Sequence, residues 1–126
     1  MTVAYVGLGA NLGGREETLR RAVELLGEAD GVDVLAVSQL RETEPVGFVD
    51  QPRFLNGAVA VVTTRTPREL LDLLVYGDEV VDQPGLRVPH PRLHERRFAL
   101  EPLAELDPEL DIPGLGRVAA RLAALD

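Results

Sequence analysis

The sequence predicts an α+β fold in which two helices cover one face of an antiparallel sheet. Three segments rich in valine have the pattern of strands, and an amphipathic helical pattern lies between the first two. A helix start signal follows the third segment, and a further strand-like stretch follows that signal. The predicted order is strand, helix, strand, strand, helix, strand, which is that of the ferredoxin-like βαββαβ class. A length of 126 residues suits a single domain, residues 1–126.

The first half of the chain has the clearest periodicity. Residues 2–6 (T-V-A-Y-V) predict a buried strand, and the glycines that follow predict a turn. From about residue 15 to residue 27, apolar residues recur at helical spacing between charged ones, which predicts an amphipathic helix. Residues 32–40 alternate and are rich in Val and Leu, so they predict a second strand. Residues 41–53 are polar and contain two prolines, which predicts a long loop of the kind that is often functional.

The second half begins with a third predicted strand, residues 54–64, in which Gly57 indicates a bulge or a close backbone approach. Thr66-Pro67-Arg68-Glu69 combines a capping threonine, a proline at the first helical position and a glutamate that completes a capping box. A short helix is therefore predicted there, and Val75-Tyr76-Gly77 then has the pattern of a strand that ends in a turn. The remaining predictions are a polar connection over 78–86, a short helix over 100–106 and a final helix over 115–122.

Composition and charge exclude several classes of function. The chain has no cysteine, so it has no disulfide framework and no thiolate nucleophile or metal ligand, which fits a cytoplasmic protein. No apolar run reaches the length that a bilayer requires, and we expect no membrane partner. A net charge of −8 would repel a phosphate backbone, so we expect no nucleic-acid partner. Small-molecule substrates, including anionic ones, remain compatible with a local cluster of arginines.

That cluster consists of Arg87, Arg92, Arg96 and Arg97. The last three lie in the segment 88–103, which reads V-P-H-P-R-L-H-E-R-R-F-A-L-E-P-L. His90 and His94 have the spacing of a helical metal site, but the prolines around His90 disfavour a helix and no third ligand is near. His90 has two possible roles: it could hydrogen-bond to a phosphate, or it could close the loop between the two prolines. A solvated basic loop would explain the arginines equally well.

Common nucleotide-binding and nucleophile motifs are incomplete or absent in this chain. Residues 7–12 (G-L-G-A-N-L) follow a strand and precede a helix, as in dinucleotide-binding proteins, but the third glycine of that motif is replaced by Leu12. A plain glycine turn is the simpler interpretation. Neither a G-x-x-x-x-G-K-[ST] loop nor a G-x-S-x-G elbow occurs. Any chemistry must therefore rest on carboxylates, arginines and histidines.

Four separated motifs together resemble those of the 6-hydroxymethyl-7,8-dihydropterin pyrophosphokinase family. They are G-L-G-A-N-L-G at 7–13, E-T-E-P-V-G at 42–47, Q-P-R-F-L-N at 51–56, and the segment 88–103. The resemblance implies a ferredoxin-like α+β fold, in agreement with the element order. It also implies transfer of pyrophosphate from ATP, as co-substrate, to the hydroxymethyl group of the pterin, with release of AMP.

The resemblance also implies roles for individual residues. Thr43, Val46 and Asn56 would hydrogen-bond the polar edge of the pterin, the first two mainly through backbone groups. Phe98 would stack on the ring and Phe54 would form a wall, because a flat heterocycle needs apolar faces and a polar edge. Ordinary core packing would also explain both phenylalanines, and a strand bulge would explain the asparagine. His90 and Arg96 would contact the phosphates of ATP, with Arg96 also catalytic.

The family pattern is interrupted between Leu71 and Asp72. Members of the family continue the second helix there, then have an arginine-rich loop with a tryptophan, and then a D-x-D pair that binds two Mg²⁺ ions. In this chain Asp72 matches the second aspartate, as metal ligand and catalytic residue, and Leu70 occupies the first position. We therefore predict a fold in which the second helix and the catalytic loop are truncated.

Two consequences follow from this interruption. A crossover between the third and fourth strands usually takes about a dozen residues, which 66–71 cannot supply. One aspartate is also a poor site for two ions, so the 126-residue chain is predicted to have little or no pyrophosphokinase activity. The alternative is a noncatalytic ferredoxin-like module that binds a pterin or a nucleotide.

Overall fold

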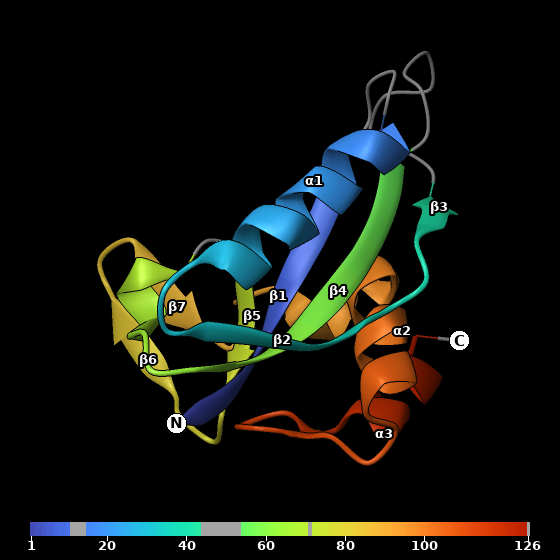
Figure 1. Ribbon diagram of the computed structural model, residues 1–126. Coiled ribbons are helices and arrows are strands. Elements are labelled where there is room, and N and C mark those ends of the chain that lie inside the picture. Colours follow the sequence, from blue (N-terminus) through green and yellow to red (C-terminus); the bar gives the residue numbers. More distant parts are fainter. Residues whose placement is uncertain (11–14, 44–53, 71, 126) are drawn as a thin grey trace.

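The protein is built around an antiparallel sheet whose central strand is β1. The computed structural model describes residues 1–10, 15–43, 54–70 and 72–125. The main path of the sheet has the strand order β2-β4-β1-β5, and β3 also pairs with β4 (Figure 1). The strands are β1 (Thr2–Ala10), β2 (Val32–Val37), β3 (Arg41–Thr43), β4 (Phe54–Thr63) and β5 (Leu73–Tyr76). All of these pairings are antiparallel, so the mixed α/β character and the antiparallel sheet are as predicted.

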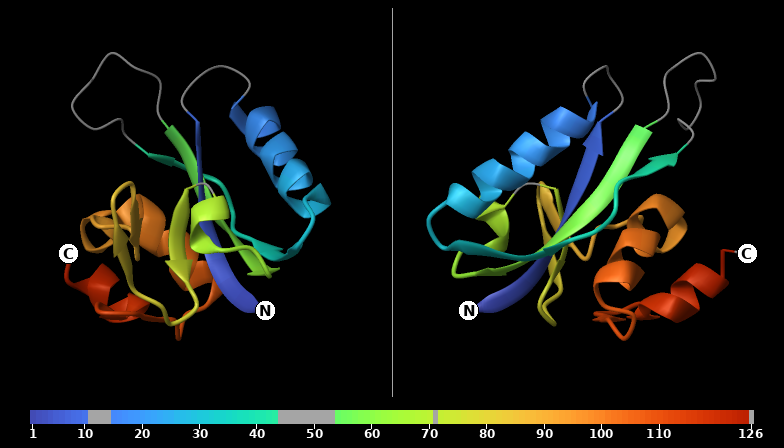
Figure 2. Two further views of the ribbon diagram at one scale, coloured as in Figure 1. Left: turned by 90° about the vertical axis from the view of Figure 1, so that its left-hand side faces the viewer. Right: turned by 45° about the vertical axis from the view of Figure 1, so that its right-hand side comes forward.

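Helices lie on both faces of the sheet. Helix α1 (Arg15–Glu28) packs against one face, and α2 (Arg97–Leu106) and α3 (Val118–Ala123) pack against the other (Figure 2). The alternation of side chains along β1 explains this, because Ala4 and Val6 join the cluster under α1 while Tyr5 joins the cluster under α2. Of the two helices predicted to cover one face, only α1 is a helix, since residues 67–69 form a single 3-10 turn, and α2 and α3 cover the opposite face. Both faces of the central strands are apolar, so both need a cover.

Strand β1 continues through the glycines that were predicted to form a turn. Gly7 pairs with Ala58 and Gly9 pairs with Asn56 in an unbroken register along β4. A side chain at Gly9 would place its Cβ 3.0 Å from Oδ1 of Asn56, so the glycine makes room for that amide. The glycines thus allow a close approach within the strand. The close approach predicted at Gly57 is also present, since a Cβ there would lie 2.9 Å from Cδ2 of Leu40.

The predicted second helix is a single 3-10 turn, η1 (Pro67–Glu69). The capping glutamate is in place, because the Glu69 carboxylate accepts hydrogen bonds from the Thr66 backbone and hydroxyl, each at 3.0 Å. The connection over 64–72 nevertheless joins β4 to β5, which run in the same direction on either side of β1.

The expectation that this connection is too short is wrong for a geometric reason. Thr63 lies opposite Thr2, and Leu73 lies opposite Val6. The distance from the end of β4 to the start of β5 therefore spans about four residues along the strands and about two strand spacings across them, which is roughly 16 Å in total. An extended connection of this length reaches about 30 Å, so no helix is needed.

Several short elements replace predicted loops or shift predicted boundaries. β3 lies within the predicted loop 41–53, and the second strand ends at Val37 rather than residue 40. Two hairpins occur where none was predicted, and α2 begins three residues early. The additional elements are β6 (Val81–Gln83), β7 (Leu86–Val88), the 3-10 turn η2 (Leu93–Glu95), β8 (Asp111–Ile112) and β9 (Gly116–Arg117).

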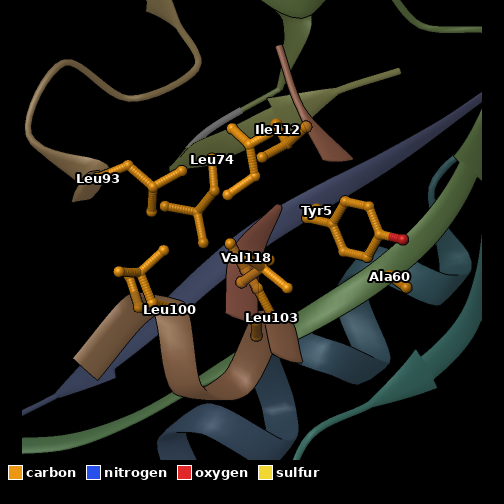
Figure 3. Close-up of a cluster of buried hydrophobic side chains, with 11 residues drawn as sticks. Tyr5, Ala60, Leu74, Leu93, Leu100, Leu103, Ile112 and Val118 are labelled. Carbon is orange, nitrogen blue, oxygen red and sulfur yellow. The ribbon is translucent and has the colours of Figure 1, made fainter. Parts of the chain in front are cut away.

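The larger core cluster holds α2 against the sheet. Leu100 and Leu103 of α2 are fully buried among Tyr5, Leu74 and Val118 (Figure 3). Burying a leucine side chain contributes about 1.5–3 kcal/mol, so these contacts fix the helix firmly. The first turn of α2, which begins at Arg97, is thereby placed beside the start of β4 and the end of β1.

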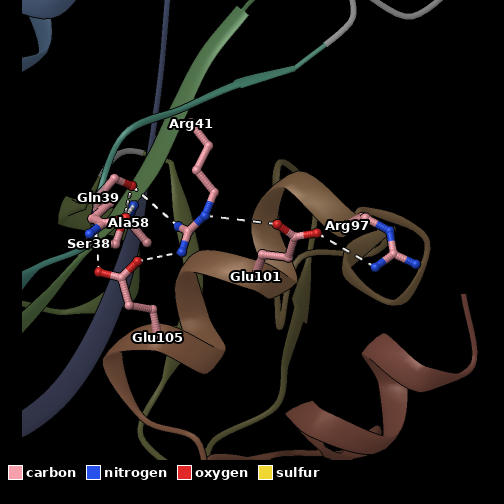
Figure 4. Close-up of polar contacts among 7 residues, drawn as sticks. All are labelled: Ser38, Gln39, Arg41, Ala58, Arg97, Glu101 and Glu105. Atoms are coloured by element: carbon pink, nitrogen blue, oxygen red, sulfur yellow. Dashed lines mark hydrogen bonds and ion pairs between the residues drawn. The ribbon is translucent and has the colours of Figure 1, made fainter. Parts of the chain in front are cut away.

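An ion-pair network ties β3 and the residue Gln39 just before it to α2 (Figure 4). The Arg41 guanidinium contacts the Glu105 carboxylate at 2.5 Å and the Glu101 carboxylate at 3.9 Å. Glu105 also accepts a hydrogen bond of 2.8 Å from the backbone N–H of Gln39, and Glu101 contacts Arg97 at 3.6 Å. The strand that leads into the motif at 42–47 is therefore linked to the helix that carries Phe98.

None of the described helices is long and apolar enough to cross a membrane.

Candidate active site

Two cavities adjoin at the edge of the sheet where β1, β4 and β5 meet the start of α2. The smaller, of about 240 Å³, is lined by Asn56, Asp72, His90, Arg96 and Phe98 together with glycines of β1 and β4. The larger has about 660 Å³, and Arg68, Leu70, Leu86 and Arg87 are among its lining residues. Asp72 and His90 line both cavities, so the two form one continuous candidate site.

The smaller cavity combines a buried amide with an aromatic ring. Asn56 is buried within β4 opposite Gly9. Phe98 is half-buried at the start of α2 and packs against the core cluster, which fixes one side of its ring. The guanidinium carbon of Arg96 lies 5.5 Å from the centroid of that ring, within the range of a cation–π contact. This arrangement can hold a flat heterocycle between an apolar face and a polar edge.

His90 is held at the junction of the two cavities by backbone bonds. Its N–H donates to the carbonyl of Leu74 at 3.0 Å, and its carbonyl accepts from the N–H of Leu93 at 3.0 Å. The ring Nδ1 accepts a hydrogen bond of 3.3 Å from the N–H of Arg92. In the neutral imidazole the hydrogen must then lie on Nε2, which leaves that nitrogen as a donor.

The surroundings of His90 favour its neutral form. Burial, then the charges of Arg96 and Arg92, lower the pKa of His90 from its ordinary value of 6.5, and the carboxylate of Asp72 opposes this only in part. The imidazole is therefore uncharged near neutral pH and acts there as a hydrogen-bonding group. An anion bound beside it would raise its pKa again.

The lowered pKa of His90 predicts a loss of stability on mild acidification. The unfolded chain binds a proton at His90 near 6.5 and the folded chain only at lower pH, so the free energy of unfolding should fall as pH drops from about 7.5 to about 5.5. Urea denaturation at both pH values should show a smaller fall for His90→Gln. The carboxyls of Glu69 and Glu95 do not interfere, because hydrogen bonds from the Thr66 backbone and from Arg92 lower their pKa values from 4.5. Equal falls in the two proteins would contradict this account.

Asp72 lies at the entrance to β5, with its side chain exposed to both cavities. Its φ of 52° is in the left-handed region, and its carbonyl accepts a hydrogen bond of 2.8 Å from the N–H of Gly7. It supplies the one carboxylate among the described residues that line the two cavities. The described residues include no group of three metal-ligating side chains. The donor set thus fits one Mg²⁺ ion completed by substrate oxygens, and it does not fit two ions.

Comparison with known proteins shows which family this chain belongs to. The chain matches the family described as 7,8-dihydro-6-hydroxymethylpterin-pyrophosphokinase, in two stretches at residues 5–75 and 67–108. The chain belongs to this family. It is similar to proteins named 2-amino-4-hydroxy-6-hydroxymethyldihydropteridine pyrophosphokinase from three bacteria. The Bacillus subtilis protein is 40% identical, in an alignment that covers 82% of this chain and 77% of the relative. The Methylorubrum extorquens protein is 38% identical, with 100% of this chain and 95% of the relative covered. The Pseudomonas aeruginosa protein is 33% identical, with 95% of this chain and 90% of the relative covered.

The comparisons also carry information about length. The alignment with the Methylorubrum extorquens pyrophosphokinase covers all of this chain and has 151 positions against 126 residues, so at least 25 positions have no counterpart here. The two stretches of the family match overlap at residues 67–75, which contain the connection through η1.

The structure brings together most of the residues that the sequence singled out for a pyrophosphokinase site. Asn56, Asp72, His90, Arg96 and Phe98 all line the smaller cavity. Thr43 and Phe54 face each other as backbone partners of β3 and β4. Val46 lies outside the described residues.

The basic cluster around His90 divides in the folded chain. Arg96 lines the smaller cavity and Arg87 the larger one. Arg92 instead contacts Glu95 at 3.0 Å, and Arg97 contacts Glu101 at 3.6 Å. Arg68 of the larger cavity was missed, because its motif was interpreted only as a helix start. The interpretation as a solvated basic loop therefore applies to Arg92 and Arg97, and not to the two arginines that line the cavities.

Proposed function

We propose that this chain transfers a pyrophosphoryl group from ATP to the hydroxymethyl group of 6-hydroxymethyl-7,8-dihydropterin. The reaction would serve folate biosynthesis and would release AMP. The observation that carries this proposal is the smaller cavity, in which an aromatic ring and a buried amide stand beside a carboxylate, an imidazole and a guanidinium. The family name and the names of the relatives point to the same reaction. None of these names supports the alternative of a noncatalytic module.

The smaller cavity would bind the pterin. Phe98 would stack on one face of the ring, and the amide of Asn56 would pair with its polar edge. We also assign Thr43 and Val46 to that polar edge through backbone groups, and Phe54 to the wall. The hydroxymethyl group would then point toward Asp72 and His90, which are shared with the larger cavity.

The larger cavity would bind ATP, with its phosphates directed to the junction. The oxygen of the pterin hydroxymethyl group would attack the β-phosphorus, and its proton would pass to solvent. The bond from that phosphorus to the α,β-bridging oxygen would break, and AMP would leave with that oxygen. Nε2–H of His90 and the guanidinium of Arg96 would stabilise charge on nonbridging oxygens. Asp72 would hold one Mg²⁺ ion, which when bound neutralises phosphate charge.

We further propose that the fold is a ferredoxin-like one with a shortened crossover. The strand order β2-β4-β1-β5 fits the βαββαβ class when β3 is counted as an addition. The missing segment of the family would fall between Leu71 and Asp72. The overlap of the family match at 67–75 and the 25 or more unmatched positions support this placement. The site would then lack much of its cover, and turnover would be slow.

The test is AMP release at high enzyme concentration in a single turnover. We expect slow release that requires both the hydroxymethylpterin and Mg²⁺, at a rate far below that of the Bacillus subtilis relative measured in parallel. Calorimetric titration with the pterin checks that the smaller cavity is occupied. AMP release that does not depend on the pterin, or no release when both substrates bind, would contradict the proposal.

A further inference from the structure

The larger cavity contains a guanidinium, that of Arg68, which forms no ion pair with any other described residue. Arg68 of η1 lines this cavity together with Arg87 of β7, His90 and Asp72. Nη2 of Arg68 donates to Oε1 of Gln83 at 3.0 Å and lies 3.4 Å from the carbonyl of Pro84, which are both neutral acceptors. None of the ion pairs among the described residues includes Arg68.

The second arginine of the cavity is only loosely paired. Nε of Arg87 lies 3.2 Å from Oδ1 of Asp82, with both side chains more than half exposed. An exposed pair of this kind is worth little and exchanges readily for a better partner. The larger cavity therefore presents two guanidinium groups and one imidazole against the single carboxylate of Asp72.

The short crossover explains why Arg68 is at this cavity. The turn η1 is held in place by the Glu69 carboxylate, which binds Thr66 and Arg65, and by Leu70, which packs on the cluster under α1. Asp72 follows Arg68 by only four positions in the sequence, and both line the same cavity. A longer crossover in this place would carry other side chains between them.

We propose that Arg68, together with Arg87, binds the polyphosphate of ATP and so supplies positive charge from the shortened crossover itself. This inference rests on the proposed function. The chain has a net charge of −8 and would repel a free nucleotide, so affinity for ATP requires a local positive site. The planar donors of a guanidinium match phosphate oxygens in pairs, which an amide cannot do.

The experiment is calorimetric binding of ATP, inorganic triphosphate and AMP to Arg68→Gln. We expect the Kd for ATP and for triphosphate to rise about tenfold, and that for AMP to rise at most about twofold, because the lost charge-assisted bonds go to the β- and γ-phosphates. The matched control is Arg117→Gln, which changes the net charge equally at an exposed position of β9. Equal effects of the two variants would overturn the inference, as would a wild-type chain that binds neither ATP nor triphosphate.

A second variant separates phosphate binding from support of the β6–β7 hairpin. Gln83→Ala removes the hydrogen bond of Arg68 to the hairpin but keeps its charge. We expect ATP affinity within about twofold of the wild type, since the guanidinium stays in the cavity. A loss equal to that of Arg68→Gln would show that Arg68 only braces the hairpin. Normal ATP binding without pterin-dependent AMP release would instead defeat the proposed function and leave this inference standing.

Discussion

Replacing Asp72 by asparagine is expected to lower the single-turnover rate of AMP release at least about a hundredfold, because the candidate site would lose the carboxylate that holds Mg²⁺. Asp72 supplies the one carboxylate among the described residues that line the two cavities, so no neighbour can replace it. An amide oxygen is neutral and binds the ion more weakly. The rate should be measured with ATP, Mg²⁺ and the hydroxymethylpterin all at saturation.

The choice of asparagine matters for the backbone. Asp72 has a φ of 52°, and asparagine tolerates this left-handed conformation better than alanine does. Asp72→Asn should therefore unfold at the same urea concentration as the wild type. Asp111→Asn, which makes the same charge change in the exposed residue of β8, should leave the rate unchanged. A wild-type rate in Asp72→Asn would refute the assigned role.

The sequence predicted those elements whose signals are local. Helix α1 begins and ends within one residue of its expected bounds, because an amphipathic period and a following turn specify it. The three valine-rich strands are also correct in kind, although β1 extends further than expected. The continuous apolar run in β1 is typical of a strand covered on both faces, which agrees with the burial of Tyr5 and of its neighbours Ala4 and Val6.

The errors concern features that only the folded chain determines. The glycines after residue 6 predict a turn, yet pairing with β4 keeps Gly7 and Gly9 extended. The capping box at Thr66 is real, but a helix needs more residues than the connection to β5 provides. The hairpin of β6 and β7 lies in the stretch predicted as a polar connection, and Pro84 and Gly85 form its turn signal.

The candidate site could be predicted only because four motifs resemble one family. No local pattern connects Asn56 with Phe98, which are distant in sequence and meet through the packing of α2 on the sheet. Arg68 shows the limit of such a resemblance. Its place at the larger cavity depends on how this particular chain shortens its crossover, which a family pattern does not describe.

Restoring the crossover should increase activity by about a hundredfold or more, since preorganised charges and exclusion of water each contribute factors of this order. The insertion would place the corresponding segment of the Bacillus subtilis relative between Leu71 and Asp72, where the two stretches of the family match overlap. An insertion of equal length made of glycine and serine is the control. It restores the length of the connection without adding charges or a cover.

The two insertions distinguish three explanations of the slow AMP release that we expect from this chain. If missing side chains limit the rate, only the segment from the relative should accelerate single-turnover AMP release. If the short connection strains the position of Asp72, both insertions should accelerate it, because either would release the connection that now joins η1 to β5. If the described residues already form the whole catalytic site, neither should help. Adding Arg68→Gln to the accelerated protein then completes the test, since the effect of that substitution on ATP affinity should shrink once other cations supply the charge.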